Sequence, residues 1–206
     1  MIYYFDEITK ASSKYYKIYN ILPDFRKQKI CKYRFFQDKL QSALAYCLLL
    51  FAADSMNINF NFKIGKYGKP YDSCKNIHFN LSHCVNSVAC IVSDNPVGID
   101  VEKIIDKDCY ISIISKVCNE REIELIKKSK NILREFTKIW TLKESYTKMI
   151  GSGIIVDLQK ICFFNFNCYF SSLEFANYIL SYCSSQHEDL IHVSFNELMD
   201  FIDKHY

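Results

Sequence analysis

The side chains best suited to chemistry lie in two short segments that are far apart in the chain. Asp100 and Glu102 stand two residues apart in the apolar run 97–102, and an extended strand would point both carboxylates to one face. Glu144 and Lys148 stand four residues apart, and a helix would bring them to one face. Three carboxylates can hold a hard cation such as Mg²⁺, and a lysine can contact a phosphate. The pattern therefore indicates phosphoryl-transfer chemistry.

Each segment also has a less specific interpretation when it is taken alone. A lone Asp-x-Glu pair is often a solvated pair on an edge strand. Glu144 and Lys148 could form an ordinary surface ion pair, which would contribute about 0.3–0.5 kcal/mol. The choice depends on whether the rest of the chain carries matching features.

The first half of the chain is predicted to contain one long helix and several strands. Apolar residues recur at helical spacing over residues 33–54, and residues 65–70 form a turn-rich loop. Pro96 breaks the chain directly before the carboxylate strand. Strands are predicted at residues 1–5, 59–64, 77–81 and 85–92. The last two strands would be joined around Ser82 and His83.

The second half repeats these ingredients without visible sequence identity. Helices are predicted at residues 120–128 and 131–150, and Gly151-Ser152-Gly153 would end the second one. Further elements are predicted as strands at 161–170, 178–183 and 190–195, and as a short helix from Asn196. The chain is therefore predicted to form two similar α+β lobes, residues 1–96 and 97–206, with mostly antiparallel sheets and the site in the cleft between them.

The composition of the 206-residue chain fits a folded protein in a reducing compartment. Half of the residues are hydrophobic, which excludes a disordered chain, and the net charge of +3 gives no indication of a nucleic-acid partner. The ten cysteines form no C-x-x-C pair, so we expect free thiols rather than disulfides or a zinc site. The sequence shows no secretory signal and no apolar run near the roughly 20 residues of a membrane span. We therefore expect a cytoplasmic protein that has no membrane partner.

Further motifs surround the two reactive segments. Gly68-Lys69-Pro70 and Phe79-Asn80-Leu81-Ser82-His83 precede the carboxylate strand, and Gly151-x-Gly153 follows the helix. Together with Val97-Gly98-Ile99-Asp100-Val101-Glu102 and Trp140-x-x-Lys143-Glu144-x-x-x-Lys148, this order and spacing resembles the 4′-phosphopantetheinyl transferase superfamily in its two-lobed surfactin-type branch. The resemblance implies two similar lobes in a pseudo-twofold arrangement, with a long helix in each.

Enzymes of that family transfer 4′-phosphopantetheine from coenzyme A to a serine of a carrier protein and release 3′,5′-ADP. The resemblance implies a Mg²⁺ ion, with Mn²⁺ as an alternative, held by Asp100, Glu102 and Glu144. It also implies that Glu144 takes the proton from the serine, directly or through a water, and that Lys148 stabilises the departing phosphate.

Other positions that match the family are expected to support this site. Lys143 would contact phosphate or pantetheine, Trp140 would anchor the helix by packing, and Glu122 matches an acid close to the metal. The phosphates of the coenzyme A nucleotide would be bound by Lys69, Ser82, His83, Arg26, Lys29 and Ser42. Residues 24–33 could equally form a solvated basic helix face. The sequence departs from the family at Gln41, where an arginine is common, so one cation of this group would be missing or replaced.

The resemblance also implies the partners of the protein. A two-lobed chain carries both halves of the site, so we expect a monomer that modifies acyl or peptidyl carrier domains of peptide, polyketide or fatty-acid synthases. Residues 107–130 are the predicted docking segment.

Two other functions stay open at this point. A metal-dependent phosphohydrolase would also use three carboxylates, but it would not need Gly-Lys-Pro or Ser-His in these places. A catalytically inactive module that binds coenzyme A or a carrier would not need the complete set of Asp100, Glu102, Glu144 and Lys148.

Overall fold

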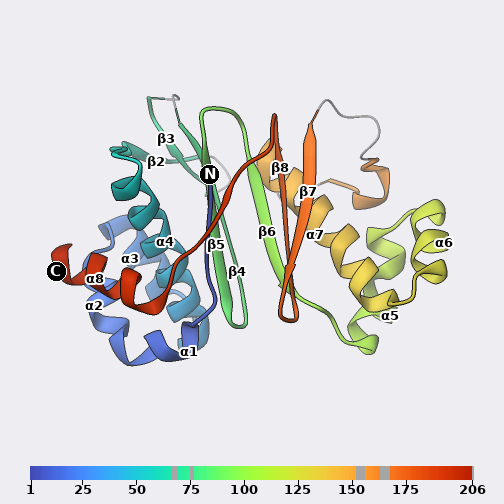
Figure 1. The fold of residues 1–206 in the computed structure, drawn as a ribbon, viewed down its shortest axis with the longest axis horizontal. Helices are drawn as coiled ribbons and strands as arrows, with labels where there is room; N and C mark the ends of the chain where they lie inside the picture. Colours follow the sequence, from blue (N-terminus) through green and yellow to red (C-terminus); the bar gives the residue numbers. More distant parts are fainter. Residues whose placement is uncertain (66–68, 75–76, 152–155, 163–167, 206) are drawn as a thin grey trace.

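The computed structural model describes residues 1–65, 69–74, 77–151, 156–162 and 168–205. Two sheets lie side by side in the middle of the molecule, and helices cover their outer sides (Figure 1). The predicted α+β class with mostly antiparallel sheets is confirmed. One long helix accompanies each sheet, namely α4 (Phe36–Ser55) and α7 (Ile132–Ile150).

The first sheet has the strand order β4-β5-β1-β9. β4 and β1 both pair with β5 in antiparallel register, whereas β9 pairs with β1 in parallel. Successive residues of β5 enter two different hydrophobic cores, because Cys90 faces α4 and Ile91 faces the second sheet. The sheet is therefore buried on both faces. Its strands are β1 (Ile2–Phe5), β4 (His78–Cys84), β5 (Ser87–Ser93) and β9 (Leu190–His192).

Short helices precede α4 along the chain and pack beside it (Figure 1). The helices at residues 8–20 were not predicted, because each is too short to show a helical period of apolar residues. The remaining elements of this half are α1 (Ile8–Ala11), η1 (Ser12–Lys14), α2 (Tyr15–Asn20), α3 (Asp24–Cys31) and the hairpin strands β2 (Phe62–Ile64) and β3 (Pro70–Asp72).

The second sheet is an antiparallel set with the order β6-β8-β7, and its register sets Asp100 opposite Ser181. Its strands are β6 (Gly98–Lys103), β7 (Tyr169–Phe175) and β8 (Tyr178–Ser184). α7 packs on this sheet, and its other side forms a small third core with α5 (Lys107–Val117), α6 (Glu120–Lys128) and η3 (Leu158–Lys160).

Gly98 allows β6 to lie unusually close to α7. A Cβ atom built on this glycine would come within 1.9 Å of the carbonyl oxygen of Ser145 and 2.6 Å of the amide nitrogen of Met149. Both atoms belong to the backbone of α7, so a side chain could be accommodated only by separating the strand from the helix. This contact sets the distance between the strand that carries Asp100 and the helix that carries Glu144.

The last part of the chain returns to the first sheet. β9 extends the edge of β1, and α8 (Phe195–His205) packs Leu198 and Ile202 into the core around α4. The predicted second lobe, residues 97–206, included both elements, so the structure corrects this assignment for residues 190–205. Neither element has a local sequence feature that could reveal which sheet it joins.

Three smaller predictions need comment. Ser82 and His83 lie inside β4, and the hairpin turn falls at Val85 and Asn86, because β4 runs on to Cys84. α7 ends at Gly151, as predicted, and this glycine has a left-handed φ of 70°, whereas Gly68, Gly153 and residues 163–167 of the predicted strand 161–170 lie outside the described residues. No helix in the described part of the chain is both long and apolar enough to span a bilayer.

Candidate active site

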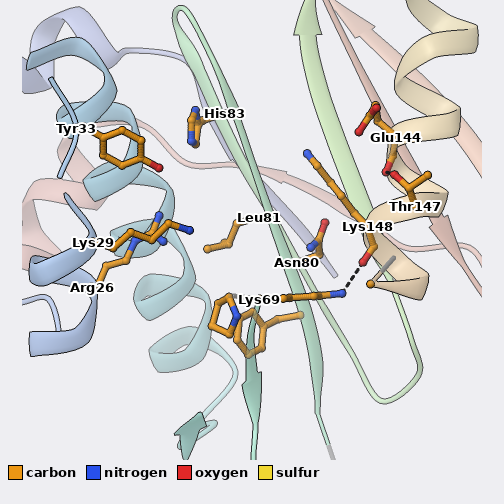
Figure 2. Close-up of a pocket in the computed structure, with 13 residues that line it drawn as sticks. Arg26, Lys29, Tyr33, Lys69, Asn80, Leu81, His83, Glu144, Thr147 and Lys148 are labelled. Carbon is orange, nitrogen blue, oxygen red and sulfur yellow. Dashed lines mark hydrogen bonds between the residues drawn. The ribbon is translucent and has the colours of Figure 1, made fainter. Parts of the chain in front are cut away.

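A cavity of about 540 Å³ lies where α3, β4 and the C-terminal half of α7 meet (Figure 2). Its charged wall has two sides: α3 contributes Arg26 and Lys29, and α7 contributes Glu144 and Lys148. The other lining residues are Tyr33, Lys69, Pro70, Phe79, Asn80, Leu81, His83, Thr147 and Gly151. The cavity is thus formed by segments that are up to about 120 residues apart in the chain.

α7 presents Glu144 and Lys148 to this cavity from one face, as their spacing predicts (Figure 2). The ion pair of Lys148 is formed with Asp100 of β6 rather than with Glu144, and its Nζ–Oδ1 distance is 2.5 Å. Lys148 also donates to the hydroxyl of Ser82 at 2.9 Å. The lysine therefore connects the helix to both sheets.

The three predicted metal ligands lie close enough to affect one another. Burial and the neighbouring carboxylates of Asp100 and Glu144 raise the pKa of Glu102 to about 7. Burial and the charge of Asp100 likewise raise the pKa of Glu144. Asp100 is only 4% exposed, and its Oδ2 atom is buried with no hydrogen-bond partner. A buried carboxylate oxygen without a donor is costly unless a cation reaches it.

The donor chemistry of this acidic group fits Mg²⁺, since all of its ligands would be carboxylate oxygens and one of them is unpartnered. The positions of the three carboxylates do not form a complete metal site in this structure. Within the described ranges, no three acidic, histidine or cysteine side chains lie close enough together to hold an ion. The ammonium group of Lys148 neutralises Asp100 in this structure.

Asn80 and Ser82 of β4 join the two sheets through their side chains. The backbone amide of Ile99 donates to the Asn80 Oδ1 atom at 3.0 Å, and that of Val101 donates to the Ser82 hydroxyl at 3.2 Å. Ser82 in turn donates to Asp100 Oδ1 at 2.9 Å. Its hydroxyl is fully engaged, so the structure assigns Ser82 to holding Asp100 and β6 rather than to the predicted direct contact with a nucleotide phosphate.

Arg26 and Lys29 of α3 lie on the opposite side of the cavity from α7. Arg26 is buried, donates to both the hydroxyl and the carbonyl group of Ser42, and lies 5.2 Å from the centre of the Tyr46 ring. Its Nε atom has no hydrogen-bond partner. Ser42 is fully buried and therefore orients Arg26 instead of facing the cavity. The alternative of a solvated basic helix face fails for Arg26, which is buried, whereas Lys29 lines the cavity and is also exposed to solvent.

The positive groups of the cavity lower the pKa values of the basic side chains beside them. Burial and the charges of Lys148 and Arg26 lower the pKa of His83 to about 4, so its ring is neutral at pH 7. Burial and Arg26 lower the pKa of Lys29, and burial and Lys148 lower that of Lys69. A cavity that gathers so many basic, hydrogen-bond-donating side chains favours an anionic ligand.

Lys69 lies at the end of α7 in this arrangement. Its ammonium group donates to the carbonyl oxygen of Lys148, in the last turn of the helix (Figure 2). The C-terminal carbonyls of a helix attract cations, which explains this position.

Lys143 and Glu122 lie away from the cavity, which contradicts the predicted contact of Lys143 with phosphate or pantetheine. Lys143 is fully buried and donates to Glu122 Oε2 at 2.6 Å. Glu122 also accepts from the backbone of Asn119 as part of the capping box of α6, so it does not join the acidic group. Trp140 is partly buried and packs beside Phe136, with ring centroids 6.1 Å apart, as expected of a packing anchor.

The sequence predictions gave no role in the site to the polar lining residues Tyr33, Asn80 and Thr147. Asn80 could have been found, since it stands two residues before Ser82 and therefore on the same face of the strand. Thr147 precedes Lys148 on the same helix. Tyr33 gives no local signal, because its place depends on how α3 and α4 meet.

Gln41 contacts the turn of the β4–β5 hairpin and does not line the cavity. It is buried, and its amide donates to the carbonyl oxygen of Val85 at 3.2 Å, beside a similar bond of 3.1 Å from Gln37. The two glutamines fix the β4–β5 turn against α4. Gln41 supplies no charge there, and the expectation that one cation of this group is missing or replaced stays a prediction.

Comparison with known proteins connects these features to one family. A sequence model described as the 4′-phosphopantetheinyl transferase superfamily matches residues 96–194, which include both β6 and α7. The 4′-phosphopantetheinyl transferase gsp of Aneurinibacillus migulanus is 36% identical over 140 residues, which cover 65% of this chain and 58% of the relative.

Two further relatives extend the comparison. The 4′-phosphopantetheinyl transferase Sfp of Bacillus subtilis (strain 168) is 32% identical over 104 residues, or 49% of this chain and 46% of the relative. The L-aminoadipate-semialdehyde dehydrogenase-phosphopantetheinyl transferase of Saccharomyces cerevisiae is 30% identical over 156 residues, or 69% of this chain and 57% of the relative. The chain thus spans about half to three fifths of the length of the curated relatives it matches.

Proposed function

Because this chain belongs to the 4′-phosphopantetheinyl transferase superfamily, in its surfactin-type branch, we propose that it transfers 4′-phosphopantetheine from coenzyme A to a serine of an apo carrier protein. The products would be the holo carrier protein and 3′,5′-ADP. One observation carries the proposal: Glu144 and Lys148 face a cavity of about 540 Å³ whose opposite side presents Arg26, Lys29 and His83.

The cations of the cavity would bind the phosphates of coenzyme A. Arg26, Lys29, Lys69 and His83 approach the cavity from three different segments, so an extended polyanion could contact all of them. His83 is neutral at pH 7 and would contribute a hydrogen bond rather than a charge. Arg26 is already oriented by Ser42, which reduces the ordering that binding requires.

Glu144 suits the role of proton acceptor. Burial and Asp100 raise its pKa toward the range in which a carboxylate accepts a proton readily. It would take the proton of the carrier serine, directly or through a water. Lys148, one turn along the helix, would hold its ammonium group at the departing phosphate oxygen.

We also propose that the acidic group of Asp100, Glu102 and Glu144 holds Mg²⁺, or Mn²⁺ in its place. The unpartnered Oδ2 atom of Asp100 and the pKa of Glu102, which burial and the two neighbouring carboxylates raise, support this. When bound, the ion would neutralise charge on the diphosphate of coenzyme A. Lys148 would have to leave Asp100 for this arrangement, and its flexible side chain allows that.

The partners and location remain proposals as well. A monomer in the cytoplasm would meet acyl or peptidyl carrier domains, and the ten free thiols suit a reducing compartment. The predicted docking segment 107–130 carries α5 and α6, which expose Ile111 and Leu125 by 60% and 61%.

The proposal is tested by incubating the protein with coenzyme A, Mg²⁺ and a panel of apo carrier domains, followed by intact mass spectrometry. A mass gain of one phosphopantetheine group on the carrier serine is expected, and EDTA should abolish it. Release of inorganic phosphate without carrier modification would identify a phosphohydrolase instead. Coenzyme A binding without either product would identify a binding module.

Substitution of Glu144 sharpens this test. Glu144→Gln removes the proton acceptor and keeps the size of the side chain, so we expect turnover to fall by about 10²–10⁴-fold while coenzyme A still binds. Isothermal titration measures the binding, and the carrier assay measures the turnover. Glu135→Gln, on the first turn of the same helix, is the matched control and should leave both unchanged. Full turnover in Glu144→Gln would remove Glu144 from the mechanism.

A further inference from the structure

Lys143 immediately precedes Glu144 in the chain, yet it occupies a different environment. Successive residues of a helix point about 100° apart, so when Glu144 faces the cavity Lys143 faces the third core. Its side chain is fully buried there. A buried ammonium group is costly unless each of its donors finds a partner.

All three donors of this ammonium group have partners. Lys143 donates to Glu122 Oε2 at 2.6 Å, to the carbonyl oxygen of Val117 at 2.8 Å and to that of Leu158 at 2.9 Å. Val117 is the last residue of α5, Glu122 lies in the first turn of α6, and Leu158 opens η3. One side chain of α7 therefore binds the three elements that pack behind it.

The hydrophobic core that joins these elements is small. Among the residues that the structure describes, it contains five buried hydrophobic residues and seven partly buried ones packed against them; the buried five are Val117, Cys118, Ile126, Phe136 and Ile139. The first core is far larger and is supported by a sheet. In a small core without a sheet, one satisfied ion pair makes a large contribution to the relative position of the helices.

We propose that Lys143 is a positioning residue: together with Glu122 it fixes α5, α6 and η3 behind α7 and thereby holds Glu144 at its place in the cavity. It touches no ligand. The inference rests on the proposed transferase function for its kinetic part, whereas its structural part can be tested without any substrate.

The structural test uses Lys143→Met, Glu122→Gln and the double variant. Lys143→Met leaves Glu122 buried without its counter-charge, and we expect the equilibrium constant for folding to fall by about 10²–10³-fold in urea denaturation. Adding Glu122→Gln removes the unpaired charge and keeps a side chain that can complete the capping box, so the double variant should recover most of the loss. Lys138→Met, at an exposed position of α7, is the control and should leave the midpoint unchanged.

The kinetic test uses Lys143→Met, or the double variant if the single one does not fold, at a temperature where the protein is fully native. We expect kcat to fall by about 10-fold or more, because small displacements of a catalytic group are costly, while the Kd for coenzyme A stays within about twofold. A purely structural lysine would leave kcat unchanged in the native protein, and that result would overturn the proposal.

Two other outcomes would also overturn it. A loss of coenzyme A affinity in Lys143→Met with unchanged stability would return Lys143 to the ligand site. Failure of Glu122→Gln to restore stability would show that the ion pair does not hold these elements. If the wild-type protein bound no coenzyme A, the transferase function would fail, but the recovery of stability in the double variant would still be measurable.

Discussion

At the scale of single residues, the site is built from side chains that satisfy one another across the two sheets. The hydroxyl of Ser82 accepts hydrogen bonds from Val101 and Lys148 and donates one to Asp100. One small side chain therefore holds strand β6, the Asp100 carboxylate and the Lys148 ammonium group in place. In this group the buried Oδ2 atom of Asp100 is left without a hydrogen-bond partner. That oxygen keeps bonding capacity that a cation could use.

The neutral state of His83 predicts a specific pH dependence. The pKa of His83 is lowered from 6.5 to about 4, so between these values the unfolded chain binds a proton that the folded chain does not. The stability of wild type relative to His83→Gln should therefore be lost as the pH falls from 6.5 to 4, by about 3 kcal/mol at most. Above pH 6.5 the difference should be constant.

Chemical denaturation of both proteins across this range measures the difference directly. The comparison is needed because Glu102 acts in the opposite direction. Its pKa is raised from 4.5 to about 7, so its contribution to folding stability is fully present below pH 4.5 and is lost as the pH rises to about 7. That contribution is shared by both proteins and cancels. A difference that does not vary with pH would show that His83 titrates normally in the folded protein.

At the scale of elements, the close contact between β6 and α7 decides whether the acids can act together. Gly98 has no side chain, and a Cβ in its place would overlap two backbone atoms of α7. β4 supports the same strand from the other side through Asn80 and Ser82. The strand that carries Asp100 and Glu102 is thus held between a helix and the neighbouring sheet.

Gly98→Ala tests this contact. Its methyl group would push β6 away from α7, which should destabilise the protein by at least about 1–3 kcal/mol and lower turnover by separating Asp100 from Glu144. Thermal denaturation and the carrier assay measure the two effects. Gly151→Ala is a steric comparison for stability alone, because Gly151 lines the cavity: no atom lies within 4 Å of its Cβ, and its φ of 70° costs about 1–2 kcal/mol. Unchanged turnover in native Gly98→Ala would show that the spacing is not critical.

At the scale of the whole molecule, the chain crosses between the sheets twice. It leaves the first sheet after β5, builds the second, and returns through β9 and α8 to the edge of β1 and the core around α4 (Figure 1). Both sheets also share the core between them, to which β1 and β5 contribute one face. The molecule should therefore unfold as one unit, although it has two main sheets.

Leu198→Ala in α8 tests the return of the chain. Leu198 is fully buried in the first core, so its truncation should cost about 2–5 kcal/mol of the free energy of unfolding. Asp200→Ala, at an exposed position of the same helix, should change it by less than about 0.5 kcal/mol. Equal stability of the two variants in urea would mean that α8 does not belong to this core.

Part of this molecule could be derived from local patterns. The strand with Asp100 and Glu102, the helix with Glu144 and Lys148 and the left-handed end of that helix at Gly151 all follow from period, spacing and residue type. Such features depend on neighbours within a few residues, which the sequence contains directly.

Other features depended on contacts between distant segments. Lys143 and Lys148 are both lysines on one helix, but the first enters a core made by α5 and α6 and the second reaches Asp100. Ser82 accepts a hydrogen bond from the backbone of β6 because β6 lies beside β4. α8 joins the first core because β9 pairs with β1. The sequence determined which groups could do chemistry and on which kind of element they stand. The tertiary structure decided which of them face one another, because burial and hydrogen bonding across the two sheets have no local sequence pattern.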